Sequence, residues 1–189
     1  IAAEEDGEKL TPDELISTCI LLLNAGHEAT VHSLGNAVKC LLEQQSPMSA
    51  LTPEAIPATV EELLRFDPPL HMFTRFAYED ITLDNATIKR GQEVALMLGA
   101  AGRDPALYDA PNRFDPTRPS KPHAAFGGGL HFCVGAPLAR LELQVALPAL
   151  FAHLPNMALA TDPKYANSYH FHKLDHLMIN PLGFGAALA

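Results

Sequence analysis

The chain has 189 residues, of which 48% are hydrophobic and 19% charged, so it is long and apolar enough to bury the core of about one domain. Its 22 acidic residues outnumber its 13 basic ones and leave a net charge of −9, which disfavours partners such as nucleic acid or an anionic membrane. No apolar run approaches the roughly 20 residues that span a bilayer. The three cysteines (Cys19, Cys40 and Cys133) are too widely spaced for a disulfide framework. With no signal sequence visible, we expect a cytoplasmic protein, and the start at Ile1 indicates a piece of a longer one.

The first predicted element is a long helix that begins at a strong start signal. Thr11 can serve as its N-cap, Pro12 suits the first helical position, and Glu14 completes a capping box. No further proline occurs before Pro47, which predicts a helix of about 34 residues. We expect so long and apolar a helix to run through the middle of the protein.

The rest of the pattern predicts a mainly α fold with small β-sheets. A second helix is expected over about 53–66, followed by strands at 73–76, 81–83 and 93–96. Residues 102–125 are rich in proline and predict an irregular surface loop, which includes His123. A third helix over 136–154 contains Pro148, which is expected to bend it, and residues 165–179 predict a hairpin.

A cysteine lies in a glycine-rich segment directly before the third predicted helix. The segment from Phe126 to Gly135 contains three consecutive glycines, which allow backbone conformations closed to other residues. Cys133 lies close to the N-terminus of that helix, where free N–H groups and the helix dipole favour a thiolate. A soft thiolate suits a transition metal, and the alternative is a buried free cysteine beside a flexible turn.

The long helix has a run of small residues near its middle. Ala25, Gly26, Ala29 and Thr30 share one face and form a notch that a flat, bulky group could approach. Close helix–helix packing is the alternative, since small residues serve that as well. Glu28 adds weight to a functional role, because a lone carboxylate in a buried helix is costly.

Two further patterns involve arginine. Glu62 and Arg65 are three residues apart and face each other on the second helix, where an exposed ion pair of little energetic value is the common case. A second arginine occurs in the segment Pro111-Asn112-Arg113-Phe114.

Taken together and in this order, these motifs resemble those of the haem-thiolate cytochrome P-450 family, in its soluble bacterial form. The family pattern Phe-x-x-Gly-x-x-x-Cys-x-Gly is met at Phe126, Gly129, Cys133 and Gly135, and its Glu-x-x-Arg pattern at Glu62. The resemblance covers nearly the whole chain but only the C-terminal half of the family's fold. It implies that residues 1–189 are the C-terminal haem-binding part of a single domain, whose N-terminal half is absent.

The resemblance also implies roles for individual residues around a haem b group. Cys133 would be the thiolate ligand of the iron, and Phe126 would shield its sulfur. The other cofactor-binding residues would be Arg75 and His131 at the propionates, Gly127 and Gly135 in the cysteine loop, and Ala25 and Gly26 on the distal face. Glu62, Arg65 and Arg113 would form a buried structural triad. The residues facing the substrate would be Leu22, Leu70, Met72, Phe73 and Phe171.

The sequence departs from the family where the distal acid is normally followed by threonine. Glu28 fits the acid, but Ala29 follows it, and Thr30 is rotated by about 100° around the helix. These three residues are the catalytic candidates, and we expect proton delivery through Glu28, water and the substrate.

The implied function is that of a monooxygenase that inserts one oxygen atom from O₂ into a small apolar organic substrate. Electrons would come from a ferredoxin or flavoprotein, and the N-terminal half of the same enzyme would be a further partner. Because of Ala29, a haem-thiolate enzyme of coupling, cyclisation or peroxide-driven chemistry is the alternative, and an inactive haem-binding fragment is another.

Two clusters of other residues have weaker interpretations. The basic residues of the proline-rich loop (Arg103, Arg113, Arg118 and Lys121) could dock an acidic electron donor, or could belong to an ordinary solvated loop. His170, His172 and His176 match a zinc site only by their number.

Overall fold

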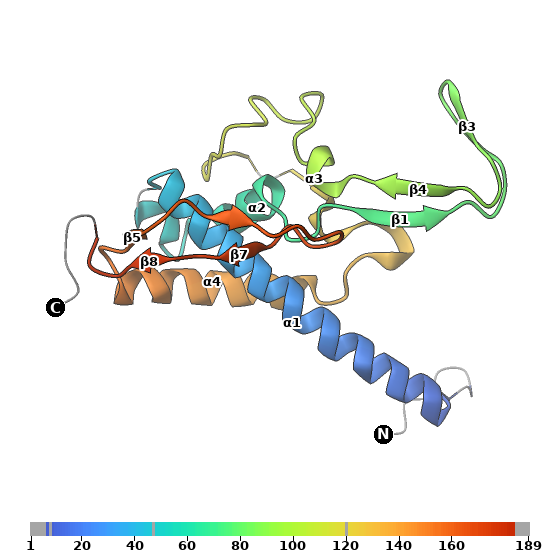
Figure 1. Cartoon of the computed structure of the whole chain (residues 1–189), viewed down its shortest axis with the longest axis horizontal. Helices are drawn as coiled ribbons and strands as arrows, with labels where there is room; N and C mark the ends of the chain where they lie inside the picture. Colours follow the sequence, from blue (N-terminus) through green and yellow to red (C-terminus); the bar gives the residue numbers. More distant parts are fainter. Residues whose placement is uncertain (1–6, 8, 47, 120, 184–189) are drawn as a thin grey trace.

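The computed structural model describes residues 7, 9–46, 48–119 and 121–183. Three longer helices dominate this part of the chain: α1 (Pro12–Glu43), α2 (Ile56–Phe66) and α4 (Ala136–His153). The shorter helical segments are η1 (Met48–Leu51), α3 (Leu98–Ala101), η2 (Ala124–Phe126) and η3 (Gly129–His131). The predicted class, mainly α with small sheets, is therefore confirmed (Figure 1).

The strands pair in small antiparallel sheets. β1 (Phe73–Phe76) pairs with β4 (Glu93–Leu96), and β2 (Ile81–Leu83) pairs with β3 (Ala86–Ile88), a strand that sequence analysis did not predict. Near the C-terminus, β5 (Ala158–Leu159) pairs with β8 (Ile179–Asn180), and β6 (Lys164–Tyr165) pairs with β7 (Leu174–His176). The last pair confirms the predicted hairpin.

Helix starts follow the local signals in the sequence. At the start of α1, the Thr11 hydroxyl accepts a hydrogen bond from the Glu14 N–H, and the Thr11 N–H donates to the Glu14 carboxylate at 2.8 Å, so the predicted capping box is present. Helix α2 starts at Ile56, three residues later than predicted, because Pro57 occupies its first turn. Helix α4 continues through Pro148.

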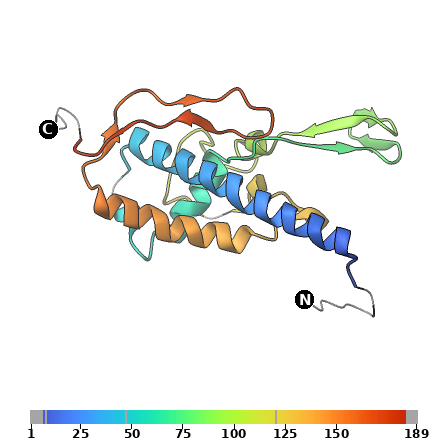
Figure 2. The ribbon, with the colours of Figure 1, turned by 60° about the horizontal axis from the view of Figure 1, so that its bottom comes forward.

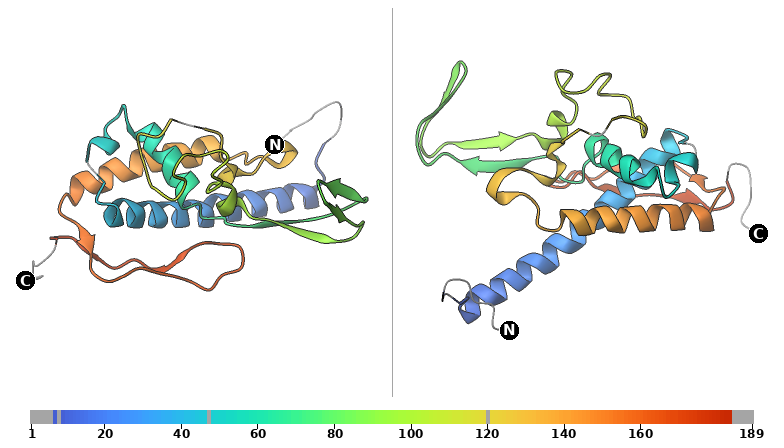
Figure 3. Two further views of the ribbon diagram at one scale, coloured as in Figure 1. Left: turned by 90° about the horizontal axis from the view of Figure 1, so that it is seen from above. Right: turned by 180° about the vertical axis from the view of Figure 1, so that it is seen from behind.

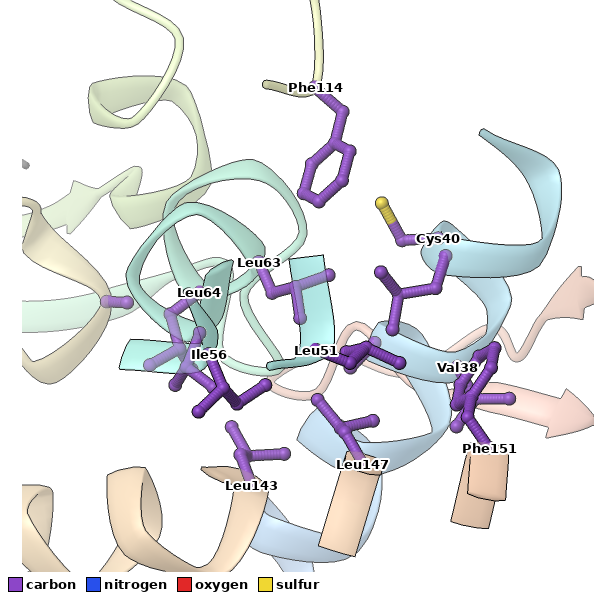
Figure 4. Close-up of a cluster of buried hydrophobic side chains, with 14 of the residues drawn as sticks. Val38, Cys40, Leu51, Ile56, Leu63, Leu64, Phe114, Leu143, Leu147 and Phe151 are labelled. Atoms are coloured by element: carbon purple, nitrogen blue, oxygen red, sulfur yellow. The ribbon is translucent and has the colours of Figure 1, made fainter. Parts of the chain in front are cut away.

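The core lies where the C-terminal half of α1 meets α2 and α4. Val38 of α1, Leu63 of α2 and Leu147 of α4 are buried together, and Phe114 of the proline-rich loop covers one side (Figure 4). Cys40 is part of this core, and burial raises the pKa of its thiol to about 12. Helix α4, which follows the cysteine loop, is thus packed against the core through Leu143, Leu147 and Phe151.

The N-terminal half of α1 is exposed in the structure, which contradicts the expectation that the whole helix is buried. Glu28 is exposed, and the residues of α1 that enter the core follow His32. The exposed half extends beyond the other helices (Figure 1). Its exposed apolar side chains are Ile16, Ile20, Leu21, Leu22, Leu23 and Val31.

The C-terminal strands lie across α1 on the side opposite α4. Figure 2 shows β5 to β8 as a layer above α1, with α4 below it. This layer meets the segment after α2 through a β-bridge between Leu70 and Phe171. None of the described helices is long and apolar enough to cross a membrane.

Candidate functional site

The three cysteines lie in three different environments. Cys19 is exposed on α1, Cys40 is buried in the core, and Cys133 is half-buried in the loop before α4. The burial that raises the pKa of Cys40 keeps that thiol protonated and unreactive. Cys133 therefore has the environment best suited to a ligand, because it combines partial access with a helix N-terminus.

The loop around Cys133 has a defined backbone path. Gly127 and Gly129 have φ angles of 71° and 64°, in a region that side chains other than glycine rarely adopt. The Cys133 N–H donates to the Phe126 carbonyl at 3.0 Å, and the Ala136 N–H donates to the Cys133 carbonyl at 3.3 Å. A side-chain carbon at Gly135 would lie 3.8 Å from the Cys133 sulfur, so glycine leaves room beside it.

Sequence analysis missed the residues that hold this loop against α2. Arg140 of α4 donates two hydrogen bonds to the Glu61 carboxylate, at 2.6 and 3.0 Å, and its guanidinium lies 4.5 Å from the centre of the Phe126 ring. His123 Nδ1 accepts from the Ala125 N–H, so its Nε2 carries the proton and donates to Glu61 at 3.2 Å.

These contacts decide the ionisation of Glu61. Burial of the carboxyl opposes its charge, but hydrogen bonds from His123 and Arg140 outweigh burial and lower the pKa of Glu61 to about 2. The side chain of His123 is only 3% exposed, which corrects the prediction of a surface residue. No sequence spacing signals this cluster, because its members come from three separate elements.

Glu62 and Arg65 form a buried ion pair, not the exposed pair that is common at this spacing. Arg65 Nε and Nη2 donate to the two Glu62 carboxylate oxygens at 2.7 and 2.8 Å, and the two side chains are 3% and 4% exposed. Arg65 Nη1 also donates to the carbonyls of Gly102 and Pro111, at 2.6 and 2.9 Å. A side-chain carbon at Gly102 would lie 2.5 Å from the Arg65 carbonyl oxygen, so only glycine fits this approach.

The prediction that Arg113 is the third member of the buried triad is wrong. The side chain of Arg113 is 69% exposed and pairs with Asp115, and only its carbonyl takes part in the cluster. Arg118 instead lies 3.3 Å from Glu62 and is 10% exposed, and it donates to the carbonyls of Asp109, Ala110 and Arg113. The chain turns after Phe114 and directs the Arg118 side chain toward Glu62. The motif around Arg113 does not indicate this turn.

The predicted distal residues lie on the exposed half of α1. A side-chain carbon at Gly26 would meet nothing within 4 Å, so the notch is open and is not used for helix packing among the described residues. Glu28 is exposed, while Ala29 and Thr30 are half-buried. The cysteine loop, the β1–β4 pair and this half of α1 lie toward the same end of the molecule (Figures 1 and 3).

Residues predicted to face the substrate come from segments that the structure brings together in part. Leu70 and Phe171 meet in a β-bridge although 101 positions separate them. The ring of His32, which sequence analysis missed, packs against the Phe171 ring with centroids 5.2 Å apart and an interplanar angle of 62°. Met72 and Phe73 are half-buried in the same segment as Leu70. Leu22 is exposed on α1.

The two residues predicted to bind propionates are both exposed. The Arg75 guanidinium on β1 donates to its neighbour's carbonyl and lies 5.8 Å from the Phe73 ring. His131 ends η3, two residues before Cys133.

The predicted basic patch on the proline-rich loop is largely absent. Arg103 donates to the Phe66 carbonyl and stacks 3.8 Å over the Phe66 ring, and Arg118 is buried in the Glu62 cluster. Arg103 thus binds a carbonyl at the end of α2, and Arg118 binds carbonyls of the irregular loop, which would otherwise lack donors. Arg113 and Lys121 are exposed, but two charges do not form a patch.

The hypothetical zinc site has no support in the structure. His172 is 3.0 Å from Asp67, and among the described residues no group of three or more His, Cys, Asp or Glu side chains could hold a metal ion.

Comparison with known proteins adds an independent finding. The family model of cytochrome P-450 matches residues 53–166, which include the Glu62–Arg65 pair and the cysteine loop. The chain is 43% identical over 175 residues to a biotin biosynthesis cytochrome P-450 of Bacillus subtilis, covering 91% of this chain and 44% of that protein. It is 46% identical over 161 residues to a vitamin D(3) 25-hydroxylase of Pseudonocardia autotrophica, covering 84% and 40%.

Solved structures agree with this result. The bacillaene polyketide synthase cytochrome P-450 PksS of Bacillus subtilis matches with a TM-score of 0.91 and 39% identity, over 96% of this chain and 48% of that one. The mainly helical fold with a cysteine loop before α4 is thus one that this chain shares with cytochrome P-450 structures. The chain belongs to the cytochrome P-450 family, and it spans under half the length of the relatives it matches.

Membership of this family implies a haem cofactor, and the residues around Cys133 fit one. Iron accepts a thiolate ligand, and Cys133 is the cysteine that is neither buried in the core nor placed on the surface of a helix. Leu130 and Val134 project from the loop, 96% and 84% exposed, as a flat apolar group would require. The open space at Gly26 is consistent with the same group.

Proposed function

We propose that this protein is the haem-binding part of a monooxygenase that inserts one oxygen atom from O₂ into a small apolar organic substrate. The observation that carries the proposal is the combination of a half-buried Cys133 at the start of α4 with the buried pair of Glu62 and Arg65 on α2. In this proposal, residues 1–189 form the C-terminal part of a single domain.

Haem b, when bound, would supply the activation of O₂, and the chain would supply its environment. Cys133 would ligate the iron, and Phe126 would shelter the sulfur from water. Arg140 supports this role of Phe126 because its guanidinium lies against the ring and is anchored on Glu61. His131 and Arg75 are exposed cations or donors suited to the propionates, while Gly127 and Gly135 leave the loop backbone free to approach the group.

Proton delivery is proposed to depend on Glu28. Its carboxylate is exposed on the half of α1 that holds the notch at Ala25 and Gly26, and Ala29 provides no hydroxyl beside it. Water and a hydroxyl of the substrate would complete the route. Ala29→Thr tests this, because a second route for protons should improve the coupling of electron use to product. The idea is contradicted if coupling does not change and substrate analogues that lack a hydroxyl react equally well.

The substrate is proposed to be apolar because the walls available to it are apolar. Leu70, Met72, Phe73 and Phe171 provide such walls after α2 and in the C-terminal layer, and Leu22 adds one on α1. The vitamin D(3) 25-hydroxylase of Pseudonocardia autotrophica acts, by its name, on vitamin D(3), which supports a substrate of this class.

Two partners are proposed. A ferredoxin or flavoprotein would supply electrons, and the N-terminal half of the enzyme would cover the exposed half of α1. The second partner is supported by the exposed apolar stripe of Ile16, Ile20 and Leu23, because exposed apolar side chains that lie together favour contact with another part of a protein. A cytoplasmic location is consistent with both partners.

The test is the absorption spectrum of the reduced, carbon-monoxide-bound protein after addition of haem. Thiolate ligation by Cys133 should give a strongly red-shifted Soret band that Cys133→Ser loses. Cys19→Ser, an exposed cysteine on α1, is the matched control and should keep the band. An ordinary Soret position in the unmodified protein would contradict the proposed ligand.

One alternative has a specific observation in its favour. Ala29 at the position after Glu28 is compatible with peroxide-driven oxidation, because hydrogen peroxide brings its own protons, and this route could also drive coupling or cyclisation. Products formed with NADH and a redox partner, compared with those formed with hydrogen peroxide alone, separate this alternative from the monooxygenase.

A further inference from the structure

A polar cluster joins the C-terminal layer to the end of α2. The Tyr165 hydroxyl donates a hydrogen bond to Asp67 Oδ2, and His172 Nε2 lies 3.0 Å from Asp67 Oδ1, so both carboxylate oxygens are engaged. The rings of Tyr165 and His172 are stacked, with centroids 3.7 Å apart and an interplanar angle of 16°. One side chain therefore holds both arms of the hairpin that contains β6 and β7.

Helix α1 takes part in the same cluster. Asn36 Nδ2 donates to the carbonyl of His172 at 2.8 Å and to that of Asp67 at 3.4 Å. Lys39 lies 3.9 Å from the Asp67 carboxylate and 5.1 Å from the centre of the Tyr165 ring. The hairpin, the segment after α2 and α1 are thus fastened at one point.

The cluster around Asp67 lies next to Leu70 and Phe171, two of the residues proposed to face the substrate. His172 follows Phe171 directly, and its N–H donates to the Pro69 carbonyl at 2.8 Å. The residues next to Pro69 and His172 are Leu70 and Phe171, and these two form the β-bridge between the segment after α2 and the C-terminal layer. A shift of the cluster would therefore move Leu70 and Phe171 relative to each other and to α1.

The cluster also has the chemistry of a permanent contact. Burial and the neighbouring Asp67 carboxylate raise the pKa of Tyr165 well above its ordinary value, so its hydroxyl remains a donor throughout the working pH range. Asp67 closes α2, where its N–H donates to the Leu63 carbonyl at 2.9 Å, which fixes the hub of the cluster on the core.

We propose that Asp67 is a positioning residue: through Tyr165 and His172 it sets the place of Leu70 and Phe171, and so helps to decide which substrates fit. The role in substrate choice rests on the proposed function, while the mechanical link between α2 and the hairpin does not. Asp67 itself touches neither substrate nor cofactor in this proposal.

Amide hydrogen exchange of the 189-residue chain tests the link without any cofactor. Asp67→Ala should raise exchange in residues 164–176 by about tenfold or more, since local opening then costs less, and should leave 73–96 unchanged. Asp67→Asn keeps an acceptor for Tyr165 and should give an intermediate rise. Asp175→Asn makes the same chemical change at an exposed site of the same hairpin and is the control.

Tyr165→Phe guards against a variant that fails to fold. It removes the hydroxyl but keeps the ring stacked on His172, and a smaller rise in exchange confined to 164–176 is expected. Unchanged exchange in 164–176 in both Asp67→Ala and Tyr165→Phe would overturn the proposal. So would an equal rise in all segments, because this indicates a loss of global stability and no positioning.

A second readout tests substrate choice on the haem-loaded chain. Imidazole and 4-phenylimidazole ligate iron through the same nitrogen, and the ratio of their dissociation constants reports the room beyond it. Asp67→Ala should change this ratio about fivefold or more, while Asp175→Asn should not. An unchanged ratio overturns the role in substrate choice. Failure of the unmodified chain to take up haem contradicts the proposed function and that role together, and hydrogen exchange still decides the mechanical link.

Discussion

Two adjacent carboxylates on α2 face in different directions and hold two different parts of the molecule. Glu62 points to the proline-rich loop, where Arg65 and Arg118 surround it and its carboxylate also accepts the Asp115 N–H at 2.9 Å. Glu61 points to α4 and the cysteine loop, where Arg140 and His123 bind it. One turn of helix thus anchors both loops.

The difference between the two clusters lies in burial and in what each one stabilises. Glu62 is 4% exposed and its partners close an irregular loop by donating to its carbonyls, so removing it leaves two arginines without a counter-charge. Glu61 is 23% exposed, and its partners lie against Phe126 beside Cys133. We infer that the first cluster mainly supports folding and the second mainly supports the shape of the candidate site.

The largest expected effect is that of Glu62→Ala. It leaves Arg65 and Arg118 without their carboxylate counter-charge, which should reduce the free energy of unfolding by about 3–5 kcal/mol. Urea unfolding measures this, with exposed Glu54→Ala as the control that should change little. A loss below about 1 kcal/mol would show that the Glu62 cluster does not contribute more to the free energy of unfolding than the Glu61 cluster.

Acid titration gives the next effect, at Glu61. Because its pKa in the folded protein, about 2, lies below the ordinary value of 4.5, its charge stabilises the fold above pH 4.5, and this contribution disappears as the pH falls from 4.5 to 2. With partial exposure taken into account, Glu61→Gln should cost about 2 kcal/mol at pH 7.

The signature of this prediction is the pH dependence of the difference between wild type and Glu61→Gln. Unfolding free energies measured between pH 7 and pH 2 should differ by a constant amount above pH 5 and converge below pH 4.5. A difference that is independent of pH down to 2 would contradict the lowered pKa of Glu61.

The smallest expected effect is the difference in stability between Arg118→Ala and Arg113→Ala. Arg118→Ala removes a buried donor to Glu62 and to three carbonyls and should cost about 1–3 kcal/mol, while Arg113→Ala, at an exposed side chain, should stay within about 0.5 kcal/mol. Thermal unfolding of both variants checks this. The reverse order would restore Arg113 as the third member of the cluster.

Local features of the chain were predictable where a structural feature depends on residues that are close together in the sequence. The capping box at Thr11, the strand at 73–76 and the pairing of Glu62 with Arg65 depend on neighbours within one or two turns or on alternation along a short segment. The candidate ligand Cys133 was identified in the same way, from its spacing to Phe126 and to the following helix.

Features that depend on the path of the chain were not predictable from these patterns. Arg118 reaches Glu62 across 56 positions, and Arg140 reaches Glu61 across 79, so both contacts depend on how α4 and the proline-rich loop fold back onto α2. Glu28 illustrates the same limit, because the length and apolar content of α1 do not say which half is covered.

By itself, the sequence determined the start of α1 at its capping box, the mainly helical class and the position of the cysteine loop before α4, because these follow from backbone conformation and from side chains a few residues apart. Only the tertiary structure decided that Glu61 supports the loop of Cys133, that Arg118 replaces Arg113, and that Asp67 joins α2 to Tyr165 and His172. The physical reason is that a buried charge takes the partner that the packed backbone brings within hydrogen-bond distance, whatever its position in the sequence.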